Sequence, residues 1–169
     1  MSKRSSKLRL NGFLLSLLLA AAPMLSAAPP EDYPFLDLTR AMQTAAGENK
    51  PMLLYFGRYG CSTCRKMHSE IFTDQALRKA LVDRFVLAYV DTESDRRIRL
   101  PNGERTTEMQ FAVRNRILGT PTFIYFDETQ QPLFKKAGFQ TVQQMQGYNS
   151  YVADGHYREQ SLKQFQAVN

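Results

Sequence analysis

The alternation of apolar and polar positions divides residues 35–165 into a series of short elements. Apolar residues recur at helical spacing over residues 35–45, and Gly47 ends this pattern, so we expect a first helix there. Residues 52–56 are almost continuously apolar, which predicts a strand buried on both faces near the centre of a sheet. Residues 85–90 have the same character and are predicted to form a second strand.

Further elements follow from the same patterns. A helix is predicted from Cys61 towards Ile71, and Thr73-Asp74 has the N-cap character that begins another helix. We expect that helix to turn four apolar side chains inward, namely Ala76, Leu77, Ala80 and Leu81. The remaining predicted elements are a helix with a capping box at residues 107–116, strands at 123–126 and 133–137, and helices at 142–152 and 161–165.

The order of these elements indicates the sheet topology. The first two strands are separated by helices, which predicts a parallel crossover, whereas the last two are joined by a short turn, which predicts an antiparallel hairpin. Residues 92–105 are charged and contain the turn signal Asn102-Gly103, so they are predicted to form a surface hairpin outside the main sheet.

The N-terminus has the pattern of a cleaved secretory signal. Four cationic residues and no acid precede an apolar stretch at residues 10–22, and small residues follow at 26–28. We therefore expect a signal peptide over residues 1–27 and one domain over residues 28–169. An uncleaved membrane anchor is the alternative, but the apolar stretch is shorter than the ~20 residues that a span requires.

Charge and cysteine content limit the classes of function that fit this chain. The formal net charge of +6 falls to +2 without the four cations of the signal, so nothing indicates a nucleic-acid partner. Cys61 and Cys64 are the two cysteines of the chain, and the loop between them is too small to staple a fold. An exported domain whose cysteines form one Cys-x-x-Cys pair favours redox chemistry.

The position of the pair supports this interpretation. Cys61 follows a predicted strand and begins a predicted helix, where free backbone N–H groups and the helix dipole lower the pKa of a thiol. Thiol–disulfide exchange requires an accessible thiolate that attacks and a second thiol that resolves the mixed disulfide. We assign the first role to Cys61 and the second to Cys64.

The chain from about residue 35 to 165 resembles periplasmic thioredoxin-like proteins. The resemblance lies in Tyr55-Phe56-Gly57-x-x-Gly60-Cys61-x-x-Cys64, in Gly119-Thr120-Pro121-Thr122 before an apolar strand, and in Gly138-Phe139. Residues 107–122 and 151–157 are most similar to the thioredoxins of bacterial sulfur-oxidation systems. The C-terminal domain of the membrane thiol-electron transporter is more distantly similar. The resemblance implies an α/β thioredoxin-like fold with a central mixed sheet of about four strands flanked by helices.

The resemblance also implies site residues. Cys61 and Cys64 would be catalytic, Pro121 would be cis, and Gly119, Thr120 and Pro121 would shape a groove in which a substrate segment pairs with the chain. Two positions depart from the common pattern. Tyr55 stands where thioredoxins usually have a buried acid that exchanges protons with the second cysteine, and Gly60 replaces a tryptophan. Water or the Tyr55 hydroxyl could serve as the proton route.

His68 lies four residues after Cys64 and is predicted to share a helix face with it. It could tune a thiol, ligate a metal together with Cys61 and Cys64, or simply be a partly exposed helix residue, and we favour the last. Arg58, Arg65 and Lys66 would favour a thiolate at Cys61 only if they point towards it.

We therefore predict a periplasmic thiol:disulfide oxidoreductase that reduces protein disulfides and receives electrons from a membrane thiol donor, because the periplasm is kept oxidising. It is expected to be a monomer with no cofactor, no bound metal and no nucleic-acid partner. Two alternatives remain open, namely an oxidant that donates its disulfide and a thioredoxin-fold module that binds or delivers a metal. The sequence does not fix the redox direction.

Overall fold

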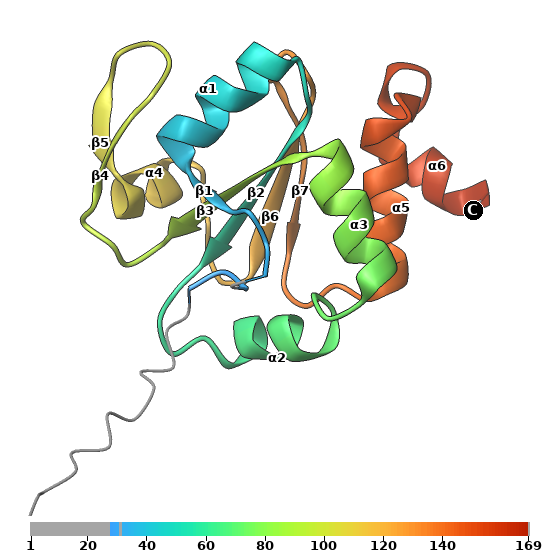
Figure 1. Cartoon of the computed structure of the whole chain (residues 1–169), viewed down its shortest axis with the longest axis horizontal. Coiled ribbons are helices and arrows are strands. Elements are labelled where there is room, and N and C mark those ends of the chain that lie inside the picture. The colour runs from blue at the N-terminus through green and yellow to red at the C-terminus, as the bar shows by residue number, and fades with distance from the viewer. Residues whose placement is uncertain (1–27, 31, 169) are drawn as a thin grey trace, which may run out of the picture.

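A five-stranded mixed sheet forms the centre of the protein, and helices cover both of its faces (Figure 1). The computed structural model describes residues 28–30 and 32–168. The predicted signal peptide, residues 1–27, lies outside the described residues. Across the sheet the strands follow the order β1-β3-β2-β6-β7.

The strand pairing agrees with the predicted topology. β3 is parallel to β1 and β2, whereas β6 is antiparallel to β2 and β7. The bounds of the strands are β1 Leu36–Asp37, β2 Met52–Gly57, β3 Val86–Asp91, β6 Thr122–Phe126 and β7 Pro132–Ala137. The α/β thioredoxin-like fold is confirmed, and β1, where we predicted the start of the first helix, is the additional fifth strand.

The helices begin and end close to their predicted bounds. They are α1 Leu38–Glu48, α2 Ser62–Glu70, α3 Gln75–Arg84, α4 Glu108–Arg114, α5 Val142–Ala153, the short 3-10 helix η1 His156–Arg158 and α6 Leu162–Val168. Asp74 caps α3 as predicted, and its carboxylate accepts a hydrogen bond from the backbone N–H of Leu77. The prediction for Ala76 is wrong, because its side chain is exposed and Leu77 and Leu81 provide the buried face of α3.

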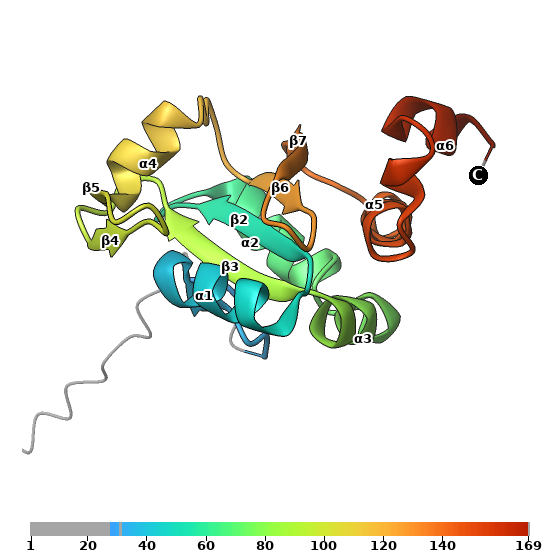
Figure 2. The same ribbon diagram turned by 90° about the horizontal axis from the view of Figure 1, so that it is seen from above.

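Alternate residues of β2 face two separate hydrophobic cores. Met52, Leu54 and Phe56 pack with α1 and α4 on one side of the sheet. Leu53 and Tyr55 pack on the other side with side chains of α2, α3 and α5. Figure 2 shows α1 and α4 on one side of the sheet and α3 and α5 on the other. Every residue of β2 is buried, as the apolar run predicted.

The predicted surface hairpin is present as a separate ribbon. Its strands are β4 Arg97–Arg99 and β5 Arg105–Thr107, and they pair with each other outside the main sheet. Thr107 then closes the predicted capping box of α4 with Gln110. The helix ends at Arg114, two residues earlier than predicted, because Arg116 adopts a left-handed conformation with φ of 52°.

A further property concerns membranes. Within residues 28–30 and 32–168, no helix combines the length and the apolar character needed to cross a bilayer.

Candidate redox site

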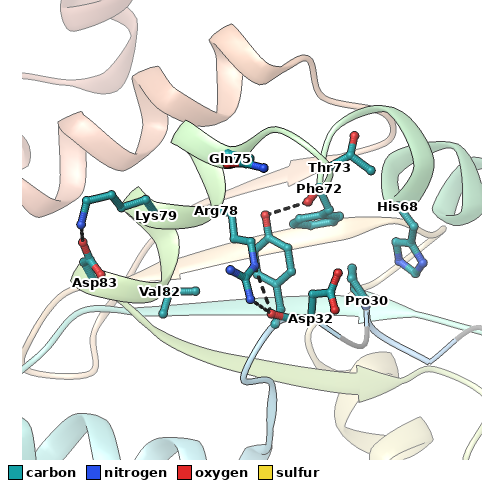
Figure 3. Close-up of a pocket in the computed structure, with 11 residues that line it drawn as sticks. Pro30, Asp32, His68, Phe72, Thr73, Gln75, Arg78, Lys79, Val82 and Asp83 are labelled. Atoms are coloured by element: carbon teal, nitrogen blue, oxygen red, sulfur yellow. Dashed lines mark hydrogen bonds and ion pairs between the residues drawn. The ribbon is translucent and has the colours of Figure 1, made fainter.

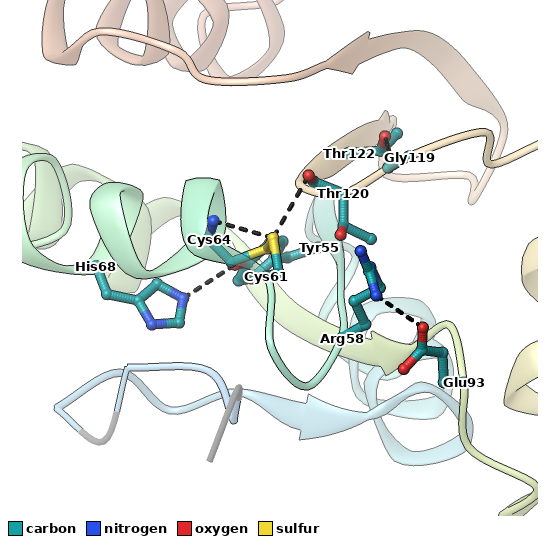
Figure 4. The surroundings of a disulfide bond; sticks show 9 residues. All are labelled: Tyr55, Arg58, Cys61, Cys64, His68, Glu93, Gly119, Thr120 and Thr122. Atoms are coloured by element: carbon teal, nitrogen blue, oxygen red, sulfur yellow. Dashed lines mark hydrogen bonds and ion pairs between the residues drawn. A yellow bond between two sulfur atoms is a disulfide. The ribbon is translucent and has the colours of Figure 1, made fainter. Parts of the chain in front are cut away.

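The two cysteines lie where β2 leads into α2, and they form a disulfide bond (Figure 4). Cys61 is the N-cap residue of α2, and the backbone N–H of Cys64 donates a hydrogen bond to the Cys61 sulfur at 3.0 Å. An N-cap side chain ordinarily accepts such a bond through oxygen. Here a sulfur occupies the place, so the unpaired N–H groups of the helix point at the atom that would carry a thiolate's charge.

The cis-proline loop faces this sulfur. The Cys61 sulfur lies 3.4 Å from the carbonyl oxygen of Thr120, and the Thr120–Pro121 peptide bond is cis. The Thr122 hydroxyl donates to the carbonyl oxygen of Gly119 at 2.7 Å and closes the loop. The structure thus brings Gly119, Thr120 and Pro121 to the disulfide from a segment 58 to 60 residues away in the sequence.

Gly60 explains one departure from the common thioredoxin pattern. Its φ of 72° lies in the left-handed region, which side-chain-bearing residues rarely adopt. The backbone entering the site at this point therefore favours glycine over the tryptophan usual in the family.

Tyr55 and His68 contact each other, although the sequence suggested a separate possible role for each of them. The Tyr55 hydroxyl and Nε2 of His68 are hydrogen-bonded at 2.9 Å. Tyr55 is completely buried, and its ring lies between Phe123 of β6 and Tyr89 of β3, its register partners on the neighbouring strands. Burial raises the pKa of Tyr55 far above its usual value and lowers the pKa of the half-buried His68.

The cations considered as thiolate stabilisers mostly have other partners. Arg58 forms an ion pair with Glu93 at 2.9 Å. Lys66 lies 3.9 Å from Glu70 and above the ring of Phe139. Arg58 and Lys66 are therefore engaged elsewhere, whereas the N-terminus of α2 contacts the Cys61 sulfur through the backbone N–H of Cys64.

The remaining candidate residues from the sequence are the possible metal ligands and the C-terminal aromatic residues. Among the residues that the structure describes, no group of three or more His, Cys, Asp or Glu side chains could hold a metal ion. Tyr148 and Tyr151 are buried core residues. His156 packs against Phe165 of α6.

A strand that leads to a Cys-x-x-Cys pair, opposite a cis-proline loop on this sheet, defines a thioredoxin-fold protein with a paired-cysteine site. The family model of the thioredoxin-like domain matches residues 38–153, and the chain belongs to this family.

Solved structures with the same fold include proteins from several bacteria. A thioredoxin-fold protein from Helicobacter pylori is 24% identical, with a TM-score of 0.61 and coverage of 71% of this chain and 82% of that one. A thioredoxin from Thermus thermophilus is 21% identical, with a TM-score of 0.58 and coverage of 71% and 86%. The reduced C-terminal domain of Neisseria meningitidis DsbD is 19% identical, with a TM-score of 0.53 and coverage of 68% and 93%. At these identities the likeness is one of fold.

The comparison with curated proteins gives no match to this chain.

Proposed function

We propose that this protein is a periplasmic thiol:disulfide oxidoreductase that reduces protein disulfides through a Cys61/Cys64 dithiol–disulfide cycle. One observation carries the proposal: the two cysteines form a disulfide at the N-terminus of α2, with the Cys61 sulfur facing the Thr120–Pro121 loop. Membership of the thioredoxin-like family supports the same chemistry.

The exposure of the two cysteine residues supports their order of action. Cys61 retains 5% of its surface, whereas Cys64 has none. In the reduced protein the Cys61 thiolate attacks a substrate disulfide and bonds to one of its sulfurs, the substrate S–S bond breaks, and the other substrate sulfur leaves as a thiolate that takes a proton from solvent. Cys64 then loses its proton and attacks the Cys61 sulfur, so the second substrate thiol leaves. Two electrons and two protons pass to the substrate, and the Cys61–Cys64 disulfide remains.

The cis-proline loop supports a substrate groove formed by Gly119, Thr120 and Pro121. Within the described part of the chain, the Thr120 backbone makes no polar contact other than that of its carbonyl with the Cys61 sulfur. It is therefore available to pair with an extended substrate segment, in the manner of an added strand. Two large apolar side chains close to these segments in sequence, Tyr59 and Leu118, are 65% and 98% exposed and suit a protein substrate.

The cellular setting is part of the proposal. Residues 1–27 would direct export and be removed, which leaves residues 28–169 as a monomeric domain in the periplasm. An oxidising periplasm does not supply electrons, so a membrane thiol-reducing donor would re-reduce the disulfide. The similarity of residues 107–122 and 151–157 to thioredoxins of sulfur-oxidation systems makes that pathway the proposed context.

Trapping tests the cycle. Cys64→Ser removes the resolving thiol and should accumulate mixed disulfides between Cys61 and substrate proteins, visible on non-reducing gels of periplasmic extract. Cys61→Ser is the matched control, because it also retains one thiol but lacks the attacking one. Absence of adducts, or equal adducts from both variants, contradicts the assignment.

The reduction potential tests the direction. Equilibration with glutathione buffers should place the Cys61–Cys64 pair nearer the value of thioredoxin, about −270 mV, than that of a strong oxidant, about −120 mV. A value near the latter would retain the exchange chemistry but make the protein a disulfide donor.

A further inference from the structure

The buried second thiol requires a path for its proton. Cys64 is completely buried, and exchange can be completed only after this thiol becomes a thiolate. Taking a proton out of a buried site requires an acceptor inside the protein or a chain of groups that leads to water. The Tyr55–His68 hydrogen bond brings two titratable side chains together from β2 and α2, the elements that flank the cysteine pair.

Helix spacing puts His68 on the face of α2 that carries Cys64, and a hydrogen bond joins His68 to Tyr55. His68 follows Cys64 by four residues, which puts the two Cβ atoms on the same helix face about 5–6 Å apart. Tyr55 reaches the same face from β2, and its hydroxyl is 2.9 Å from Nε2 of His68. Figure 4 shows this nitrogen directed at Tyr55 and the other ring nitrogen directed away from the disulfide.

The outer side of His68 opens into a pocket. This pocket has a volume of about 790 Å³ and lies between the end of α2, the helix α3 and the segment before β1 (Figure 3). His68 lines its wall together with Phe72 and Arg78. The imidazole thus lies between the buried hydroxyl on one side and a solvent-accessible pocket on the other.

We propose that Tyr55 and His68 form the proton path of Cys64, and this inference rests on the proposed exchange function. As Cys64 attacks the mixed disulfide, its proton passes to the Tyr55 oxygen while the Tyr55 proton passes to Nε2 of His68. His68 then loses its Nδ1 proton to water in the pocket. The Cys64 thiolate forms the bond to Cys61, the mixed disulfide breaks, and the departing substrate thiolate takes a proton from solvent.

The protonation properties of the two residues agree with these roles. Burial raises the pKa of Tyr55, so the tyrosine passes a proton on without remaining a phenolate. Burial lowers the pKa of His68, which keeps the imidazole neutral and able to accept a proton near neutral pH. The pair therefore works as a relay in which histidine is the base.

Several polar groups that line the pocket have partners of their own. The Tyr33 hydroxyl donates to the Phe72 carbonyl, and Arg78 donates to the Asp32 carbonyl. Across the pocket, on α3, Lys79 is paired with Asp83. Charged and titratable groups face the pair from three neighbouring elements. Tyr89 belongs to β3, Asp32 and Tyr33 belong to the segment before β1, and α3 contributes Arg78, Lys79 and Asp83. Burial is the cause of the lowered His68 pKa.

The test follows the reactions of the two cysteines separately, because one occurs after the other. The reduced protein is mixed with dithiobis-nitrobenzoate, whose thiolate is coloured when released. Attack by Cys61 gives the first release, and attack by Cys64 on the Cys61 mixed disulfide gives the second. In Tyr55→Phe and in His68→Gln we expect the second release to be at least fivefold slower near neutral pH, with its pH profile moved to higher pH. The first release should stay within twofold of wild type.

Matched variants remove the same chemical groups elsewhere. Tyr125→Phe deletes a buried tyrosine hydroxyl that donates to Asn149, and His156→Gln replaces a histidine remote from the disulfide. Both should leave the second release unchanged. The double variant Tyr55→Phe/His68→Gln should be no slower than the slower single variant, because both residues belong to one path.

The outcomes distinguish the relay from the exchange cycle. Suppose that the wild type gives two releases and that the second release keeps its rate and pH profile in both single variants. This result would overturn the proton path and leave the exchange cycle intact. Losses that multiply in the double variant would also overturn it. A wild-type protein that gives no second release would overturn the exchange cycle, and the proton path with it.

Discussion

The helix N-terminus at Cys61 should make this thiol acidic once the disulfide is reduced. The variant Cys64→Ser isolates the effect, because Cys61 is then the single cysteine of the chain. The substitution retains the backbone N–H of residue 64, which donates to the Cys61 sulfur at 3.0 Å. The electrostatic feature under test is therefore preserved.

The magnitude follows from the position of the sulfur. A negative charge at a helix N-terminus is stabilised by about 0.3–1 kcal/mol when exposed and by up to ~2 kcal/mol in a partly buried site. Cys61 is 5% exposed and directly at the N-cap, so we take about 1–2 kcal/mol. Because 1.36 kcal/mol corresponds to a factor of ten, the ratio of thiolate to thiol at a given pH should rise roughly 5- to 30-fold above that of a free cysteine.

The rate of alkylation by iodoacetamide, followed as a function of pH, measures this directly. The midpoint for reduced Cys64→Ser should lie well below the free-thiol value of about 8.5. Cys61→Ser is the control, since its remaining thiol at Cys64 is buried and should react more slowly and at higher pH. A Cys61 midpoint at the free-thiol value, or equal reactivity of the two thiols, would refute the reasoning.

Three further predictions concern stability. Arg96→Ala should lower the free energy of unfolding in urea by about 1–3 kcal/mol, because it leaves the buried Glu108 carboxylate without its ion-pair partner. Gly57→Ala should cost about 1–3 kcal/mol in thermal unfolding, since the added methyl carbon would lie 2.8 Å from the Tyr89 ring. Burial lowers the pKa of His68, so the unfolded chain binds more protons than the folded one and stability should fall as the pH drops below about 6.5. His68→Gln should weaken this pH dependence.

Each stability prediction has a matched control. Lys79→Ala breaks an exposed ion pair and should change stability by less than about 1 kcal/mol. Gly147→Ala places its methyl group in open space on α5 and should not destabilise. For His68→Gln the matched histidine substitution is His156→Gln, at a residue that packs against Phe165 of α6. Losses in these controls equal to those in the test variants would contradict the proposed causes.

Local patterns predicted most of the elements because periodicity and capping act over a few residues. The strand at 52–56, the N-cap at Asp74 and the capping box at Thr107 were all visible in the sequence and are present. β1 was not predicted, since two residues carry no periodicity and their extended conformation depends on pairing with β3. Ala76 was misplaced because helical spacing alone does not fix where a buried face ends.

Some features of the redox site could likewise be predicted from local sequence, and others could not. The Cys-x-x-Cys pair after a strand and before a helix could be predicted from residues 52–71, and family resemblance implied the cis geometry of Pro121, which the structure contains. Whether Arg58 and Lys66 act on the thiol could not be predicted, because long charged side chains choose among partners that only the folded surface supplies. Both are paired away from Cys61.

The sequence by itself determined the order of the strands and helices that follow β1 and the position of both cysteines at a helix start, because backbone propensity, capping and apolar alternation are local properties. The tertiary structure alone decided that Tyr55 meets His68. Tyr55 faces α2 because alternate residues of β2 point to opposite cores, and His68 meets its hydroxyl because α2 packs on that face of the sheet. A contact that depends on how one element crosses another is set by packing of the whole core, and no local pattern encodes it.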